Sequence, residues 1–175
     1  MSYDLGKKCV FLGFALRAAQ PLVMWLLAVL FPAAVAPTVN AVITILSALA
    51  IAGGFGMMWL CEHNILDLAI ACLSFLGSAT VFIPTFGLGT AASVLVGVGA
   101  SFYLAVWAFK NLGKNVISAG IIGCAFIFFA VAPPLSNHIA AMYGNEAMAV
   151  ASSIISVIKI GASAVLGLIA LREEE

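Results

Sequence analysis

The residue best placed to do chemistry in this sequence is Lys159, which is the single charge inside a long apolar run, residues 147–171. Ser152 and Ser156 precede it by seven and three residues, and Ser163 follows it by four, so the four side chains share one face of a helix. In a bilayer, a buried ammonium persists only when it is paired, hydrated or able to reach the membrane surface. This face can therefore line a watery path, bind an anionic lipid headgroup, or hydrogen-bond a neighbouring helix. The alternative is that Lys159 extends to the membrane surface and has no ligand.

A second polar face comes from Arg17 and Gln20, which precede Pro21 in another apolar run. Proline removes a backbone hydrogen bond, so we expect a kink at this position. The long stem of Arg17 can also reach the headgroups, which is the simpler interpretation of its charge. Because Arg17 and Lys159 are both basic and have no acid in register, the sequence favours anionic partners over cations.

The amino-acid composition shows whether these side chains lie in water or in a lipid bilayer. The chain has 175 residues, of which 65% are hydrophobic and 8% are charged. A soluble domain has about 25% charged residues, so this sequence is that of an integral membrane protein. It has no basic patch for nucleic acid, no glycine-rich phosphate loop and no paired carboxylates within its apolar runs. With two histidines, it offers no metal or haem site of its own. We therefore expect no enzymatic activity and no cofactor.

The apolar runs predict an all-α fold, a bundle of about six transmembrane helices that forms a single domain over residues 1–175. A spanning helix needs about 20 mostly apolar residues. We expect prolines to end the first and fifth spans, at Pro32 and at Pro133-Pro134, and a polar break at residues 61–64 to end the second. The predicted spans are 9–31, 38–60, 65–83, 90–109, 115–132 and 147–171.

Lysine and arginine positions predict the orientation. The basic residues outside the apolar runs flank the first span, the turn between the fourth and fifth spans, and the end of the sixth; they are Lys7, Lys8, Lys110, Lys114 and Arg172. Basic residues prefer the cytoplasmic side, so both termini are predicted to be cytoplasmic. Trp59 and Trp107 are expected at the same interface, where an indole is favoured.

Small residues predict close helix packing. Pairs at helical spacing occur in three of the predicted spans: Gly97 with Ser101, Gly120 with Gly123, and Ser163 with Gly167. Small side chains allow helix backbones to approach closely in lipid. Because these residues lie on several helix faces, the chain is predicted to form a homo-oligomer or part of a larger membrane assembly. Packing within the single chain is the alternative.

Residues 93–132 combine a small-residue helix, a basic turn from Lys110 to Lys114, and a helix with Gly120 and Gly123. This hairpin resembles the two-helix pilin of bacterial type IV secretion and conjugation systems. The resemblance implies a bacterial inner-membrane location and bound phospholipid, with Lys110 and Lys114 as candidates for lipid or anion contact beside Lys159 and Arg17. The four further predicted spans, and the lack of a long cleavable leader, depart from that family.

Two functions follow from these observations. The first is a non-enzymatic, pilin-like or inner-membrane component of a type IV secretion or conjugation machine, in contact with lipid. The alternative is a small transporter or channel for an anionic or neutral solute, lined by the serines and Lys159.

Overall fold

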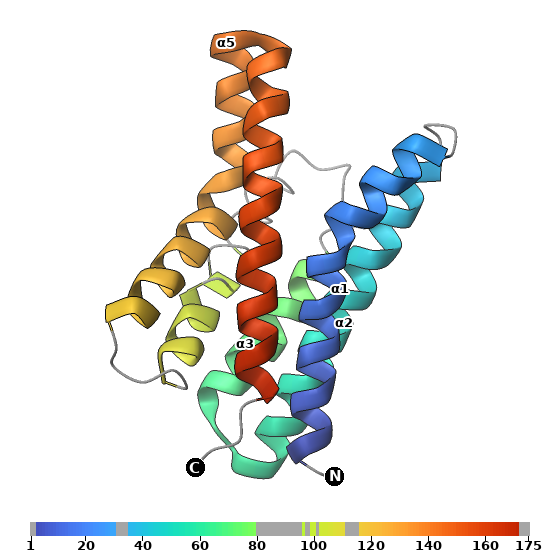
Figure 1. Cartoon of the computed structure of the whole chain (residues 1–175). Helices are drawn as coiled ribbons and strands as arrows, with labels where there is room; N and C mark the ends of the chain where they lie inside the picture. Colours follow the sequence, from blue (N-terminus) through green and yellow to red (C-terminus); the bar gives the residue numbers. More distant parts are fainter. Residues whose placement is uncertain are drawn as a thin grey trace.

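The chain is all-helical over the part that the structure describes (Figure 1). The structure is a computed structural model, and it describes residues 3–30, 35–79, 96, 99–100, 102–110 and 116–171. Within these ranges every residue except His63 and Asn64 is helical, which confirms the predicted all-α class. The long helices are α1 (Tyr3–Leu30), α2 (Val35–Glu62), α3 (Ile65–Ala79) and α5 (Val116–Leu171), and residues 102–110 are also helical.

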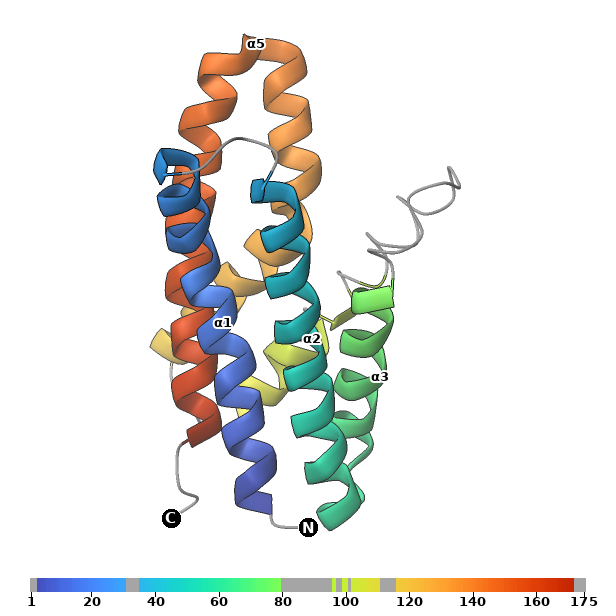
Figure 2. The same ribbon diagram turned by 90° about the vertical axis from the view of Figure 1, so that its right-hand side faces the viewer.

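Helices α1 and α2 form an antiparallel pair whose backbones are in close contact (Figure 2). A Cβ atom added at Gly13 would lie 2.6 Å from Cγ1 of Ile51 and 2.8 Å from the carbonyl oxygen of Ser47. A Cβ atom at Gly54 would lie 2.6 Å from Cγ2 of Val10. Since no side chain fits at these two positions, glycine sets the distance between α1 and α2.

The turn between α2 and α3 falls inside the polar break that the sequence predicts. His63 has a φ of 54°, and its N–H donates to the carbonyl oxygen of Trp59 at 2.7 Å. Asn64 Oδ1 accepts a hydrogen bond of 3.1 Å from the N–H of Leu66, which caps the start of α3.

Helix α5 does not end where the sequence predicts the end of the fifth span, so that prediction is wrong. The helix continues through Pro133-Pro134 and turns back at Gly144, where φ is 85° and ψ is 178°. Figure 1 shows the resulting hairpin, whose first half lies before Gly144 and whose second half follows it. Proline bends a membrane helix without ending it when the remaining backbone groups keep their partners. A glycine at positive φ is a stronger signal for the end of a helix than a proline is.

Three helices are long and apolar enough to cross a membrane: Tyr3–Leu30, Val35–Glu62 and Ala149–Leu171. The chain is thus a membrane protein with transmembrane helices. A shorter apolar helix covers Ile65–Leu76. Much of the predicted fourth span, 90–109, lies outside the described residues, and the complete six-span bundle stays a prediction.

The apolar core occupies the half of the bundle where α1 begins and α5 ends. It contains Phe14 of α1 and Phe55 of α2, and the Phe55 ring meets the edge of Trp107 with 5.1 Å between centroids. Trp107 is only 5% exposed, and its indole packs in this core while also lining a polar cavity with Glu62 and Lys110. Its position at the membrane interface stays a prediction. Gly167 of α5 packs on Phe14, with 3.4 Å from an added Cβ to the Phe14 Cβ. In Figure 1, α1 and the second half of α5 diverge beyond this contact.

Candidate functional site

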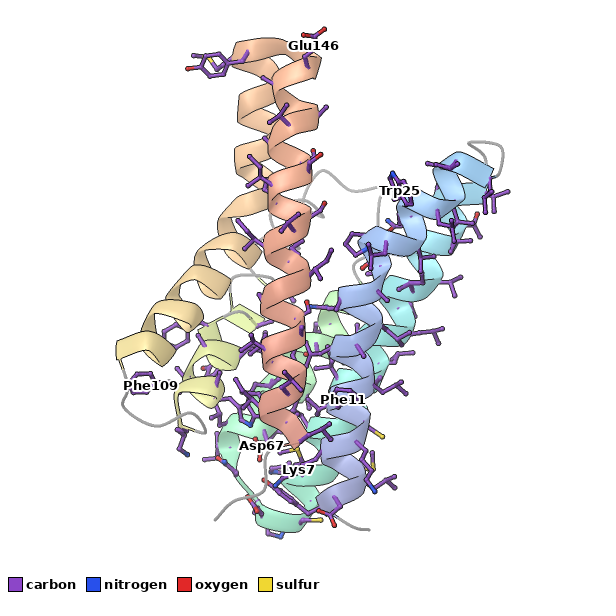
Figure 3. All side chains as sticks on the ribbon, viewed as in Figure 1. Lys7, Phe11, Trp25, Asp67, Phe109 and Glu146 are labelled. Atoms are coloured by element: carbon purple, nitrogen blue, oxygen red, sulfur yellow. The ribbon has the colours of Figure 1, made fainter. Side chains whose placement is uncertain are left out.

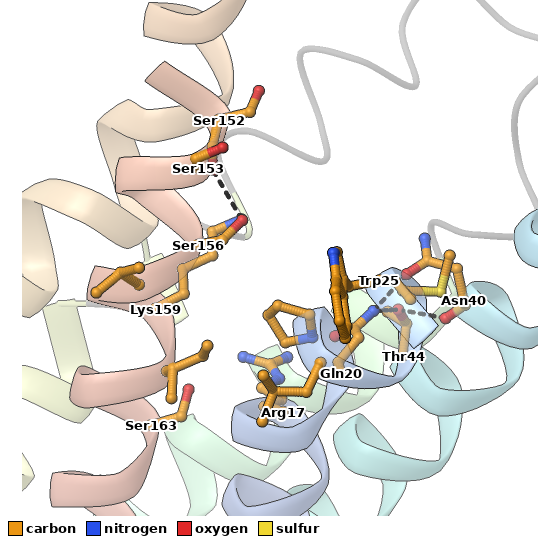
Figure 4. Close-up of a pocket in the computed structure, with 15 residues that line it drawn as sticks. Arg17, Gln20, Trp25, Asn40, Thr44, Ser152, Ser153, Ser156, Lys159 and Ser163 are labelled. Carbon is orange, nitrogen blue, oxygen red and sulfur yellow. Dashed lines mark hydrogen bonds between the residues drawn. The ribbon is translucent and has the colours of Figure 1, made fainter. Parts of the chain in front are cut away.

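A polar pocket of about 720 Å³ lies between α1, α2 and the second half of α5 (Figure 4). It begins near the middle of these helices and extends toward the end of the bundle where α1 finishes and α2 starts. The core closes the opposite side. Polar lining comes from Arg17, Gln20, Asn40, Thr44, Ser152, Ser153, Ser156, Lys159 and Ser163, and apolar lining from Pro21, Leu22, Met24, Trp25, Val157 and Ile160.

Two positive charges face this pocket from different helices. Arg17 is on α1 and Lys159 is on the second half of α5, and Figure 4 shows both side chains beside the same gap. Each lies near the midpoint of its candidate span, Tyr3–Leu30 or Ala149–Leu171. Both side chains line the same pocket, so two like charges share one cavity. No carboxylate lines the pocket among the described residues, so nothing there neutralises this pair.

Hydrogen bonds between α1 and α2 order one wall. The Gln20 Nε2 group donates to Asn40 Oδ1 at 2.6 Å and to Thr44 Oγ1 at 2.9 Å. The Thr44 hydroxyl in turn donates to the carbonyl oxygen of Asn40 at 2.8 Å. With its two partners fixed on α2, the Gln20 amide holds α1 and α2 in register just beyond Arg17.

The serines of α5 form the opposite wall, and they differ in their hydrogen bonding. The Ser156 hydroxyl donates to the carbonyl oxygen of Ser152 at 2.8 Å, and the Ser153 hydroxyl donates to that of Ala149 at 2.9 Å. Ser163 is 1% exposed, and its Oγ has no hydrogen-bond partner among the described residues. A buried hydroxyl without a partner is unfavourable. Because the Ser163 oxygen is itself fully buried, a ligand in the pocket can contact it only after a neighbouring side chain moves.

The structure therefore brings together two polar faces that the sequence presents separately. One is Arg17 with Gln20, and the other is Lys159 with the serines at 152, 156 and 163. Sequence reasoning missed Asn40 and Thr44. The sequence feature that could have identified these two residues is their spacing of four within the apolar run of α2, which places both on one helix face.

Other predicted site residues lie elsewhere. Lys110 lines a separate cavity of about 220 Å³ with Glu62 and Asp67, at the far end of α2 from the polar pocket. Figure 3 shows Asp67 and Lys7 at the end of the bundle where α1 begins, and Glu146 at the opposite end. Lys110 thus has nearby acidic groups, and it does not join Arg17 and Lys159.

The predicted packing residues also differ in position. Gly167 lies against Phe11 and Phe14 of α1, so its contact is within this chain. Gly120 and Gly123 belong to the first half of α5. Gly97, Ser101, Lys114 and Arg172 lie outside the described residues.

Within the described ranges, no three His, Cys, Asp or Glu side chains lie close enough to hold a metal ion. Comparison of the chain with protein-family models, with curated proteins and with solved structures gives no match. The pocket itself therefore carries the information on function.

Proposed function

We propose that this protein is a small membrane transporter that binds an anionic solute in the pocket between α1, α2 and the second half of α5. The observation that carries the proposal is the pair Arg17 and Lys159, which face one cavity without a carboxylate among its described lining. Each charge is unfavourable at the centre of a bilayer by roughly 2.5 to 3.5 kcal/mol on insertion scales. An anion between them would relieve both this penalty and their mutual repulsion.

The shape of the bundle supports binding from one side. Beyond the polar lining, the second half of α5 diverges from α1 (Figure 1), whereas the core around Phe14 and Phe55 fills the space toward the end of the bundle where α1 begins. In this arrangement a solute enters from the end of the bundle where α1 finishes. Release on the other side requires α1 and α5 to separate at their contact near Gly167.

The pilin-like function remains a separate prediction. It depends on residues 93–132, and its basic turn and most of its small residues lie outside the described residues or have no described side-chain surroundings. The described geometry favours solute binding, because Lys159 and Arg17 meet in a cavity and not on the outer surface. Native mass of the extracted protein distinguishes a small transporter from a large secretion assembly.

The test of anion binding uses the full-length protein in phosphatidylcholine nanodiscs. Isothermal titration with phosphate, sulfate, acetate and alkyl phosphates should give binding to the unaltered protein. Arg17→Gln and Lys159→Gln should each weaken it by roughly tenfold or more, the loss expected for a charged hydrogen bond. Lys8→Gln is the matched control, because Lys8 is exposed near the start of α1 and remote from the pocket.

Besides unchanged binding in both pocket variants, two further results would contradict the proposal. One is that no anion in the panel binds the unaltered protein. The other is that Lys8→Gln weakens binding as much as the two pocket variants do, because the effect would then come from total charge and not from the pocket.

A further inference from the structure

The chemistry of the pocket narrows the ligand class further, provided that it binds anions as proposed above. Its two cations lie on different walls, α1 and α5, so the ligand must present negative oxygens in two directions. A carboxylate has two oxygens in one plane, and a single arginine can engage both of them. A phosphate monoester carries three terminal oxygens and a charge of about −1.5 to −2 at pH 7, which matches two cations.

Ser163 adds a third polar contact beside this pair. Its hydroxyl is buried, lines the pocket and lacks a partner among the described residues. It lies one helical turn from Lys159 on the same face of α5. If a neighbouring side chain moves to expose this hydroxyl, a tetrahedral group between Arg17 and Lys159 has a further oxygen for it, which a planar carboxylate held by Arg17 lacks.

On α1, the lining beyond Arg17 includes exposed apolar side chains. Leu22 is 60% exposed and Trp25 is 68% exposed, and both lie on α1 beyond Arg17. Figure 3 shows Trp25 on the outer part of α1, away from the ends of the chain. A cavity of about 720 Å³ is larger than inorganic phosphate requires, and it is typical of sites for whole organic molecules. The pocket thus has a charged interior and a mouth that is apolar on its α1 side, whereas α2 and α5 contribute polar side chains such as Asn40 and Ser153.

We infer that the ligand is an amphipathic phosphate monoester, with its phosphate between Arg17 and Lys159 and its apolar part over Leu22 and Trp25. Two sources share this chemistry. One is a membrane lipid with a monoester headgroup, such as phosphatidic acid, and the other is a soluble organic phosphate.

Titration of the full-length protein in phosphatidylcholine nanodiscs tests the chemical class. Hexyl phosphate should bind at least about tenfold more tightly than hexyl sulfate, heptanoate or inorganic phosphate. Leu22→Ser should weaken binding of hexyl phosphate and leave that of inorganic phosphate unchanged. Leu12→Ser is the control, because Leu12 is similarly exposed on α1 but does not line the pocket.

A quenching measurement distinguishes the two sources. Nanodiscs that contain brominated phosphatidic acid, or brominated phosphatidylcholine at the same mole fraction, are compared for quenching of Trp25 fluorescence. The Trp25 signal is the difference between the unaltered protein and Trp25→Phe. Excess quenching by phosphatidic acid that Lys159→Gln removes assigns the lipid source. Hexyl phosphate binding without such an excess assigns the soluble source.

Equal or tighter binding of heptanoate or hexyl sulfate would overturn the phosphate assignment. Equal binding of inorganic phosphate would overturn the role of the apolar α1 side of the mouth. Either result leaves the proposed anion transporter intact, whereas failure of every anion to bind would overturn both proposals.

Discussion

Lys159 and Arg17 each place a positive charge halfway along an apolar helix. Such a charge is unfavourable inside a bilayer unless it has a partner. Extension toward the headgroups explains an isolated lysine or arginine. It does not explain why both side chains line one cavity with the buried Ser163. A shared anionic ligand accounts for all three positions.

Substitution of Lys159 separates ligand binding from extension to the surface. Lys159→Met should abolish anion binding and increase membrane insertion, because removal of the charge favours insertion. Lys159→Arg should keep part of the binding, since the charge survives with altered geometry. Titration and the yield of inserted protein measure the two effects. Unchanged binding in Lys159→Met would show that the lysine only extends to the surface.

Ser163 provides a prediction about stability. Ser163→Ala should raise the free energy of unfolding of the ligand-free protein by about 1 kcal/mol, because it removes a buried hydroxyl without a partner. It should also weaken anion binding. Ser47→Ala is the control, because Ser47 is equally buried, its hydroxyl donates to the carbonyl oxygen of Thr44 at 2.9 Å, and it does not line the pocket. Thermal unfolding with and without hexyl phosphate measures both quantities, and destabilisation of the ligand-free Ser163→Ala protein would contradict the assignment.

The sequence predicts which polar residues share a helix face, because helical periodicity is local. It therefore identifies Lys159 with its serines, and Arg17 with Gln20. It does not predict that these faces meet, since the rotation of one helix against another depends on packing between distant residues. Asn40 and Thr44 were missed for this reason, because their role appears only when Gln20 lies opposite them.

At the element scale, adjacent glycines of α2 have different surroundings. A Cβ at Gly54 would meet Val10 and the Gly6 carbonyl oxygen of α1 within 2.7 Å, whereas a Cβ at Gly53 would meet nothing within 4 Å. Gly53 and Gly54 are consecutive residues of α2, so they lie at nearly the same position along the helix axis. They differ only in whether they face α1.

This difference predicts opposite effects of one substitution. Gly53→Ala should leave the protein as stable or stabilise it by up to about 1 kcal/mol, because alanine favours a helix. Gly54→Ala should destabilise it by roughly 1 to 3 kcal/mol, since the added methyl group forces α1 away from α2. Thermal unfolding in detergent measures both variants. Equal effects at the two positions would refute the close packing of α1 on α2.

Helix ends show which local signals are reliable. The polar break at residues 61–64 was predicted and is confirmed, because Asn64 caps α3 through its side chain. The predicted end at Pro133-Pro134 was wrong, and Gly144 marks the turn. Proline removes one hydrogen bond from a helix that keeps its others, whereas glycine adopts the positive φ that reverses the chain.

On the scale of the whole molecule, the bundle divides into a packed half and a polar half. The core around Phe55 and Trp107 closes one end, and the pocket lies beyond it. The first residue of α1 and the last residue of α5 lie at the closed end (Figure 1). The cytoplasmic location of this end follows from its lysines and remains a prediction.

Topology is testable by chemical labelling. In a protein without native cysteines, Lys8→Cys and Lys110→Cys should react with a membrane-impermeant maleimide only from the cytoplasmic side, because basic residues are retained there. Glu146→Cys should react only from the opposite side. These three positions are exposed in the structure, so access is not limited by burial. Reaction of Lys110→Cys from the side opposite to Lys8→Cys would contradict the predicted orientation.

The most direct test of the central claim is a double-mutant cycle on anion binding with Arg17→Gln, Lys159→Gln and both together. If one anion contacts both side chains, each single variant should lose roughly tenfold or more in affinity, and the double variant should lose clearly less than the product of the two. The measurement is titration of hexyl phosphate into the full-length protein in nanodiscs. Single variants that bind as tightly as the unaltered protein would contradict the claim that Arg17 and Lys159 hold an anion between them.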